Sequence, residues 1–446
     1  MNARVLNPVL LALLLVFPCA LFAQEMALEY HGAGWVQFGK VESSYMSPDP
    51  GADLKDDYNK NWMQSTGGQL DLTAKMDSNW DAGLALGVVG VHLPRGGMSV
   101  ASYWYPFWVP YVGEARISYS HPGFSSGKFR LTLGSFSYDY SPDAKNLGLY
   151  LMRGYVYPGA VESGFGGIFG GMAHYEQAGF GNDLILKSED ERPSYDLSLA
   201  DVVSYQILPG LEIGAGVNFY RLVSQTDCSP GGYGLCSIQD TVKADTGIVR
   251  DSITGNVKID SITGSLSGTK LMGRFHMDPK ALFGFSSLGS LALGKQDLIL
   301  YGEAAILGLT NYPLVYDDML RRIPVMVGFN FPVFGYLDYL SLEVEYYASK
   351  NSSDNVGANW GGGWVPLQEN DPSGKNDPDL RYYKKRDDWK WSVNASRVLF
   401  GHMQLSAQVA DDHLRPGGWH DSPWVGKEAF RTPKDWYWTC KLAYFF

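Results

Sequence analysis

The feature that most constrains the fold is a strict alternation of apolar and polar residues, repeated in short segments along the whole chain. In residues 69–76, for example, Leu70 and Leu72 alternate with Gln69 and Asp71. A β-strand has a period of two residues, so each such segment predicts a strand with one apolar and one polar face. Segments of this kind, sixteen when weaker ones are included, lie at 28–38, 69–76, 80–88, 111–119, 129–134, 164–175, 182–189, 195–207, 211–219, 271–277, 298–306, 325–331, 340–346, 389–396, 403–409 and 435–446.

Composition excludes several classes of protein. The mean hydropathy is only -0.15, which is too polar for a bundle of transmembrane helices. The chain has 52 Gly, 28 Tyr, 21 Phe and 13 Trp, and only 19% charged residues, as expected of a large β protein rather than a disordered one. Phosphate binding needs an excess of Lys and Arg, so the formal net charge of -11 argues against nucleic acid as a partner.

The N-terminus has the layout of a secretory signal peptide. Arg4 is followed by an apolar run over 9–17, Pro18 ends the run, and Ala23 offers a small residue for cleavage. Nine apolar residues are too few to span a bilayer as a helix. We therefore expect residues 1–23 to be removed, leaving residues 24–446 as a single domain.

The last segment carries the most specific signal. One face of the predicted strand presents the apolar and aromatic series Trp436, Trp438, Cys440, Leu442, Tyr444 and Phe446. This ending resembles the C-terminal signature of bacterial outer-membrane β-barrel proteins, in which the final strand is recognised by the barrel-insertion machinery. The resemblance makes Trp438, Leu442, Tyr444 and Phe446 the expected insertion signal. The alternative is the buried last strand of a soluble sandwich.

The connections between strands also alternate in length. Short turns fall near 77, 122, 209, 334 and 400, whereas long polar connections fall at 43–64, 93–108, 140–162, 223–266, 309–322, 349–387 and 412–434. This rhythm is typical of transmembrane antiparallel up-and-down barrels, with short periplasmic turns and long extracellular loops. We predict such a barrel with about 16 strands, 14 to 18 being possible, and one long periplasmic segment at 279–296.

Charged residues on the polar faces indicate how the interior is used. A barrel of this size leaves a water-filled channel, in which charges of both signs can be hydrated. The alternative is an interior sealed by salt bridges. The predicted pore-lining residues are Asp71, Lys75, Glu114, Arg116, Arg130, Lys270, Arg274, Glu303, Glu343 and Glu345.

Porins, which the chain resembles in architecture, have a third extracellular loop that folds inward and narrows the channel. The resemblance makes residues 140–162 the constriction-loop candidate, with an ordinary outward loop as the alternative. The residues concerned are Tyr138, Asp139, Tyr140, Asp143 and Lys145. Resemblance to porins also implies a homotrimer, and Tyr30-His31-Gly32 is similar to the first strand of maltoporin-type channels.

Two further sets of residues lie in the long connections. Cys228 and Cys236 flank a turn-rich segment and are expected to form a disulfide in an oxidising compartment. Four tryptophans are candidates for glycan contact, namely Trp360, Trp364, Trp419 and Trp424. The acidic stretch 371–379 favours a solvated loop over a calcium site.

No catalytic or metal-binding motif is evident, and no cofactor is expected. We predict a porin-like passive channel for small hydrophilic solutes, surrounded by outer-membrane lipid. Two alternatives stay open: a surface barrel that binds polysaccharide through its Trp-bearing loops, and a transporter of hydrophobic solutes.

Overall fold

The structure is a computed structural model of the 446-residue chain. It describes residues 27–44, 60, 62–92, 108–121, 127–152, 167–188, 197–223, 248–250, 257–259, 268–309, 319–347, 389–414, 430 and 433–446.

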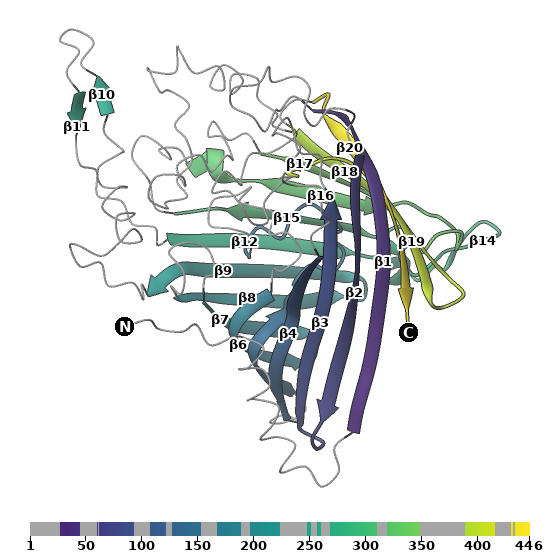
Figure 1. The fold of residues 1–446 in the computed structure, drawn as a ribbon, viewed down its shortest axis with the longest axis horizontal. Coiled ribbons are helices and arrows are strands. Elements are labelled where there is room, and N and C mark those ends of the chain that lie inside the picture. The colour runs from purple at the N-terminus through teal and green to yellow at the C-terminus, as the bar shows by residue number, and fades with distance from the viewer. Residues whose placement is uncertain are drawn as a thin grey trace.

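Sixteen antiparallel strands form one closed barrel, in which each strand pairs with its neighbours in chain order (Figure 1). The predicted fold and strand number are therefore confirmed. The barrel strands are β1 (Ala27–Ser43), β2 (Trp62–Lys75), β3 (Trp80–His92), β4 (Trp108–His121), β5 (Lys128–Ser137), β6 (Gly167–Gln177), β7 (Phe180–Ser188), β8 (Leu197–Leu208), β9 (Leu211–Val223), β12 (Gly268–Met277), β15 (Leu300–Ile306), β16 (Val325–Asn330), β17 (Tyr339–Tyr346), β18 (Trp389–Leu399), β19 (Met403–Asp411) and β20 (Trp436–Phe445).

The barrel closes where β1 pairs with β20, from Ala33 opposite Phe445 to Ser43 opposite Trp436. Beyond the last strand, the N–H of Gly32 donates to the Phe446 carbonyl over 2.8 Å, and the N–H of Phe446 donates back over 3.0 Å. Closure satisfies the backbone groups that a free sheet edge would leave unpaired.

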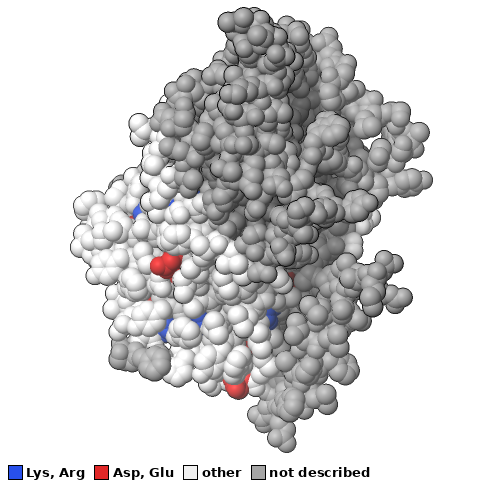
Figure 2. Space-filling view, turned by 90° about the vertical axis from the view of Figure 1, so that its left-hand side faces the viewer, with Lys and Arg blue, Asp and Glu red and all other residues white. Residues whose placement is uncertain are grey.

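The alternation of the sequence becomes an inner and an outer face. On β17, Ser341, Glu343 and Glu345 point inward and are fully buried. On the outer face, apolar side chains such as Val327 and Leu405 are nearly half exposed. The described surface in Figure 2 is mostly uncharged, with a few scattered ionic groups.

One polar pair interrupts the outer face away from the strand ends. Asn182 on β7 and Asp201 on β8 alternate with inward residues of their strands and so point outward. The Asn182 side-chain amide donates to the Asp201 carboxylate over 2.6 Å. Leu184, which pairs with Asp201 in the ladder, is 45% exposed beside it.

Tight turns join several strands. Gly210, in the two-residue turn between β8 and β9, has φ 80°, which glycine adopts without steric cost. A longer connection between β12 and β15 contains the short helix α3 (Pro279–Phe283) and the hairpin of β13 (Ser287–Leu288) and β14 (Leu291–Ala292). β10 (Ile248–Arg250) and β11 (Val257–Ile259) pair in a small sheet of their own, and η1 (Met319–Arg322) precedes β16. Among the described residues, no helix is long and apolar enough to cross a membrane.

A β-bulge corrects one prediction from the alternation. The pattern placed Tyr111 on the same face as Ala115, opposite Glu114. In the ladder, however, Ala85 faces Glu114 and Leu86 faces Val112, so Gly113 is an extra residue in β4. An inserted residue reverses the side-chain alternation beyond it. Tyr111 therefore points inward, where its hydroxyl donates to Gln69 over 2.9 Å.

Candidate functional site

The chain that leaves β5 turns into the barrel rather than continuing outward. Residues 138–152, which we call the inward loop, cross to the inner face of β12, β15 and β17. Leu147, Tyr150 and Leu151 in this loop are at most 1% exposed.

Glu343 on β17 holds the tip of the inward loop. Its carboxylate accepts the backbone N–H groups of Lys145, Asn146 and Leu147, the last two over 2.9 Å. The Tyr301 hydroxyl of β15 donates to the same carboxylate over 2.9 Å. Hydrogen bonds to an ionised acceptor are stronger than those between neutral groups. This fully buried carboxylate thus fixes three consecutive peptide groups of the loop.

Glu303 on β15 holds the next turn of the loop. It accepts the N–H of Leu149 over 2.9 Å and the N–H of Tyr150 over 2.8 Å. It also accepts the Tyr140 hydroxyl over 2.7 Å, and that hydroxyl in turn accepts the N–H of Leu151 over 3.0 Å. Glu303 therefore joins Tyr140, near the start of the loop, to Leu149 and Tyr150, near its end.

Further contacts join the inward loop to other strands. The Asp143 carboxylate lies 2.5 Å from Nδ1 of His276 on β12. The Tyr138 hydroxyl donates to Asp183 on β7 over 2.8 Å, and the same carboxylate meets His174. Burial, together with the negative charge of Asp183, raises the pKa of Tyr138, so its phenol stays protonated and remains a donor.

Apolar packing seals the loop against the wall. The buried side chains that meet there are Tyr140, Leu147, Tyr150, Leu151, Val202, Met272, Ile299, Tyr301, Ala305, Leu307, Met326 and Tyr347. Their contact explains why the wall beneath the loop carries Met272 and Met326 among polar inward residues.

A second segment turns inward beside the first. It consists of residues 412–414, which follow β19, and Phe430, which precedes β20. His413 contacts the Glu345 carboxylate over 2.7 Å, and Phe430 stacks on Tyr437 with ring centroids 5.2 Å apart. The Asn146 amide at the tip of the inward loop donates to Asp412 over 2.6 Å. The two inward segments therefore touch and cover the same side of the interior.

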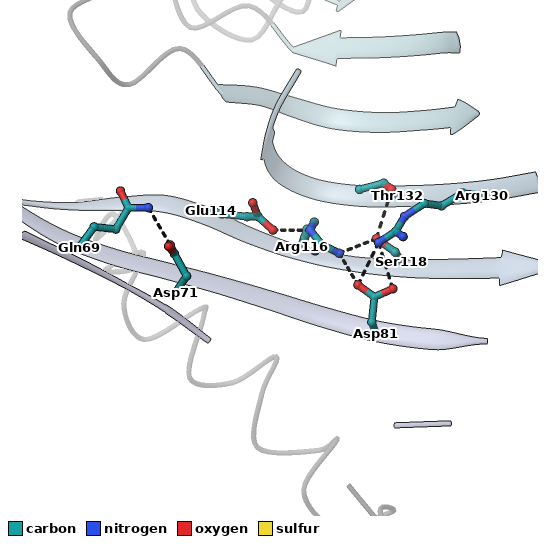
Figure 3. Close-up of polar contacts among 8 residues, drawn as sticks. All are labelled: Gln69, Asp71, Asp81, Glu114, Arg116, Ser118, Arg130 and Thr132. Carbon is teal, nitrogen blue, oxygen red and sulfur yellow. Dashed lines mark hydrogen bonds and ion pairs between the residues drawn. The ribbon is translucent and has the colours of Figure 1, made fainter. Parts of the chain in front are cut away.

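The opposite wall carries a charged cluster on β3, β4 and β5, which we call the arginine cluster: Asp81, Glu114, Arg116 and Arg130 (Figure 3). Arg116 bonds both Asp81 and Glu114, and Arg130 meets Asp81 over 3.0 Å. These side chains stay partly exposed, from 18% for Asp81 to 39% for Arg130. The two walls thus differ in their access to solvent.

The ten predicted pore-lining residues all lie on the inner face, but their surroundings differ. Four are buried under the inward segments: Lys270, Glu303, Glu343 and Glu345. Arg274 pairs with Glu212 over 2.7 Å, and Lys75 pairs with Glu29 over 2.7 Å on exposed side chains. The remaining four, which are partly exposed, are Asp71, Glu114, Arg116 and Arg130.

The five residues proposed for the constriction loop are all in the inward loop. Asp139 accepts the N–H of Ser141 over 2.8 Å, and the Lys145 ammonium lies 5.0 Å from the Tyr339 ring centroid. The remainder of the predicted loop, 153–162, lies outside the described residues.

The other predicted sites also lie partly within and partly outside the described residues. Trp438, Leu442 and Tyr444 on β20, and Phe446 directly after it, share the outer face, and the last three are 45–61% exposed. Predicted residues outside the described part of the chain are Cys228, Cys236, Trp360, Trp364, Trp419 and Trp424. Cys440 is a free thiol. No cluster of metal-ligating side chains occurs among the described residues.

Sequence reasoning missed several inward residues. The alternation in residues 80–88 puts Asp81 on the polar face but indicates no role for it, and the alternation in residues 111–119 puts Tyr111 on the wrong face. Asp412 and His413 fell in a segment predicted to be an outward loop. The glycine at position 113, within an otherwise regular strand, is the signal that could have indicated the bulge.

Comparisons with known proteins identify no family for this chain. No protein-family model matches the chain, and no curated protein matches it in sequence. OmpF of Salmonella typhi, in a complex with daunomycin, superposes with a TM-score of 0.46 at 9% identity, covering 94% of this chain and 97% of that chain. A mutant of the Rh. blastica porin gives a TM-score of 0.43 at 9% identity, covering 94% and 100%. Likeness at this level establishes neither a family nor a function.

Proposed function

We propose that the protein is a passive channel through which small hydrophilic solutes cross the bacterial outer membrane. The observation that carries the proposal is the arginine cluster: charges of both signs, partly exposed on the inner wall of a closed barrel. A barrel of 16 strands is too wide for its own inner side chains to fill, and charged side chains require water or partners.

The inward loop supports the proposal because it divides the interior unequally. It covers the wall of β12, β15 and β17, where Lys270, Glu303 and Glu343 are at most 3% exposed. It leaves the β3–β5 wall partly exposed. We infer that the solute path follows this wall, with the inward loop as its opposite boundary and constriction.

The outer face of the barrel indicates what surrounds the protein. Apolar side chains there suit the hydrocarbon of a bilayer, and aromatic residues such as Trp62 and Trp438 suit its interface with water. We propose that outer-membrane lipid surrounds the barrel and that the barrel-insertion machinery recognises the C-terminal signature that ends at Phe446. We also propose that the channel assembles as a homotrimer. Export would remove residues 1–23. N-terminal sequencing of the mature protein tests this, and the sequence obtained should begin at Gln24.

The decisive experiment is single-channel recording of the purified protein in planar lipid bilayers. We expect stepwise increases in conductance whose size scales with salt concentration. A heat-denatured sample serves as the control for contaminating pores. If the refolded protein inserts, as judged by protease protection, but no steps appear, the channel proposal is wrong. Capture of a bacterial polysaccharide without conductance would instead favour the adhesion alternative.

A further inference from the structure

The connection between β12 and β15, residues 279–296, belongs neither to the inward segments nor to the arginine cluster, and we call it the rim segment. It contains α3 and the hairpin of β13 and β14, and it lies beyond the ends of the barrel strands, at the end of the barrel where the C-terminus lies (Figure 1). We infer that the rim segment rests on the membrane, with its apolar side chains among the phospholipids of the periplasmic leaflet. This inference goes beyond the proposed channel, because it requires the barrel to span a bilayer but not to pass solutes.

The rim segment exposes apolar side chains outside the barrel wall. Its residues 281–294 include no charged side chain at all. Three large apolar residues within them are open to the surroundings: Phe283 is 72% exposed, Leu288 44% and Leu291 49%. A group of exposed apolar side chains of this kind marks a surface that contacts a membrane or another protein.

The polar groups of the rim segment are turned inward instead. Asp297, directly after the segment, is fully buried and accepts the N–H of Gly294 over 2.8 Å and that of Phe334 over 3.0 Å. The Lys280 ammonium pairs with Asp278 over 2.9 Å and donates to the Asp297 carbonyl. A connection surrounded by water has the opposite arrangement, with polar groups outside. The exposed apolar side chains are therefore presented by a hydrogen-bonded base.

The hairpin of the rim segment has two different faces. Leu288 and Leu291 pair across β13 and β14, so their side chains lie on one face. Ser287 and Ala292 form the next pair and point to the opposite face, because side chains alternate along a strand. Gly289 in the turn has φ 62°, which glycine adopts without steric cost. The hairpin thus offers one leucine face and one face of smaller side chains.

Continuity with the barrel surface favours lipid as the contact of the leucine face. The base of α3 packs on the turn between β8 and β9, where the N–H of Asp278 donates to the Gly210 carbonyl over 2.7 Å. A Cβ atom added to Gly210 would lie 2.9 Å from Cβ of Ala281. Directly before this turn, Ile207 and Leu208 are nearly half exposed at the end of β8. The apolar surface of the barrel therefore adjoins the rim segment.

Size and charge favour a lipid surface over a protein partner. A stable protein–protein interface takes about 20–30 residues a side, which is more than the rim segment contains. Its only charged residues are Lys280 and Lys295, and Lys295 is exposed. A lysine beside apolar residues suits the boundary between acyl chains and anionic headgroups. Because the backbone groups of so short a hairpin need water or headgroups as partners, the segment belongs at this boundary and not deeper in the hydrocarbon.

Spin labels on the two faces of the hairpin test the inference. Leu288→Cys and Ser287→Cys are each labelled with a nitroxide, in a chain whose own cysteines are replaced by alanine. The folded protein is reconstituted in vesicles of phosphatidylethanolamine and phosphatidylglycerol. Oxygen concentrates among acyl chains and a nickel chelate stays in water, so the ratio of their collision rates with the label reports its depth. We expect this ratio to be several-fold higher at position 288 than at position 287, which is the matched control.

Two further labels separate the possible outcomes. Leu405→Cys places a label on the outer face of the barrel and should give the high ratio of a lipid-facing site, and Phe283→Cys should behave like Leu288→Cys. If the label at 405 lies in lipid but those at 283 and 288 meet the nickel chelate as often as that at 287, the inference is wrong. Labels at 283 and 288 that are shielded from both reagents would mean that a second copy covers them, which also overturns it. A label at 405 in contact with water would overturn the membrane location itself, and with it both proposals.

Discussion

Replacing Glu343 with glutamine should release the tip of the inward loop. The wild-type carboxylate is an acceptor only, and it meets four donors: three backbone N–H groups and the Tyr301 hydroxyl. Glutamine keeps the size and shape but exchanges one acceptor oxygen for a donor amide. In Glu343→Gln, the new side-chain amide would face backbone N–H groups, whose hydrogen bonds it cannot accept.

The magnitude follows from burial and charge. Glu343 is fully buried, so water cannot replace the lost bonds. Hydrogen bonds to a charged group contribute about 1.5–3 kcal/mol each to stability. Because every ~1.4 kcal/mol is a factor of ten, losing one such bond should lower the ratio of docked to released loop by about ten- to a hundredfold. The strand ladder is unaffected, so the barrel itself should remain closed.

Hydrogen exchange of the folded protein in detergent micelles measures this change directly. The amides of Lys145, Asn146 and Leu147 should exchange about ten- to a hundredfold faster in the variant, since exchange follows local opening. Channels formed by the variant should also show larger and noisier currents. Glu29→Gln is the control, because Glu29 pairs with Lys75 on exposed side chains away from the loop. Unchanged protection of the three amides in a folded Glu343→Gln variant would refute the reasoning.

Three other changes have defined outcomes. Arg116→Gln leaves two carboxylates beside a single arginine, so reversal potentials in a salt gradient should shift towards cation preference. Asp81→Asn should shift these potentials towards anion preference. The same reversal potential in the two variants would contradict a solute path along this wall. Asp201→Leu removes a carboxylate from the lipid-facing side and should raise the free energy of unfolding in lipid vesicles by about 1–2 kcal/mol, whereas a loss of stability would mean that the hydrogen bond from Asn182 outweighs the cost of placing the carboxylate in lipid. Alkylation of the unreduced mature protein, followed by mass spectrometry, should modify Cys440 alone, and modification of Cys228 and Cys236 as well would rule out the predicted disulfide.

Local patterns predicted the barrel because each strand carries its own alternation. The turn at Pro209-Gly210 and the strands around it could be placed without knowledge of any distant residue. Tyr111 was misplaced for an equally local reason, since one extra residue at Gly113 reverses the faces of everything before it. The two-residue repeat of a strand and the choice of which residues face inward are separate properties, and a bulge changes only the second.

The site was harder to predict because its contacts join residues far apart in the chain. Glu343 follows Leu147 by 196 residues, and Asp412 follows Asn146 by 266. The sequence indicated that Glu343 points inward but not that backbone N–H groups of a loop would cover it. Only the folded barrel brings these elements together, and the inward course of residues 412–414 has no local signal at all.

The pairing of β1 with β20 determines the order in which the protein can form. Ala33 must find Phe445, and the Gly32 backbone must find Phe446, across almost the entire length of the chain. Until then, the growing sheet has two open edges that can pair with other molecules. Bringing such distant ends together is entropically unfavourable and slow. Before this last step, the chain avoids aggregation only if other molecules cover the two open edges of the sheet. Once the barrel has closed, no edge is left to which a protease or another strand can bind.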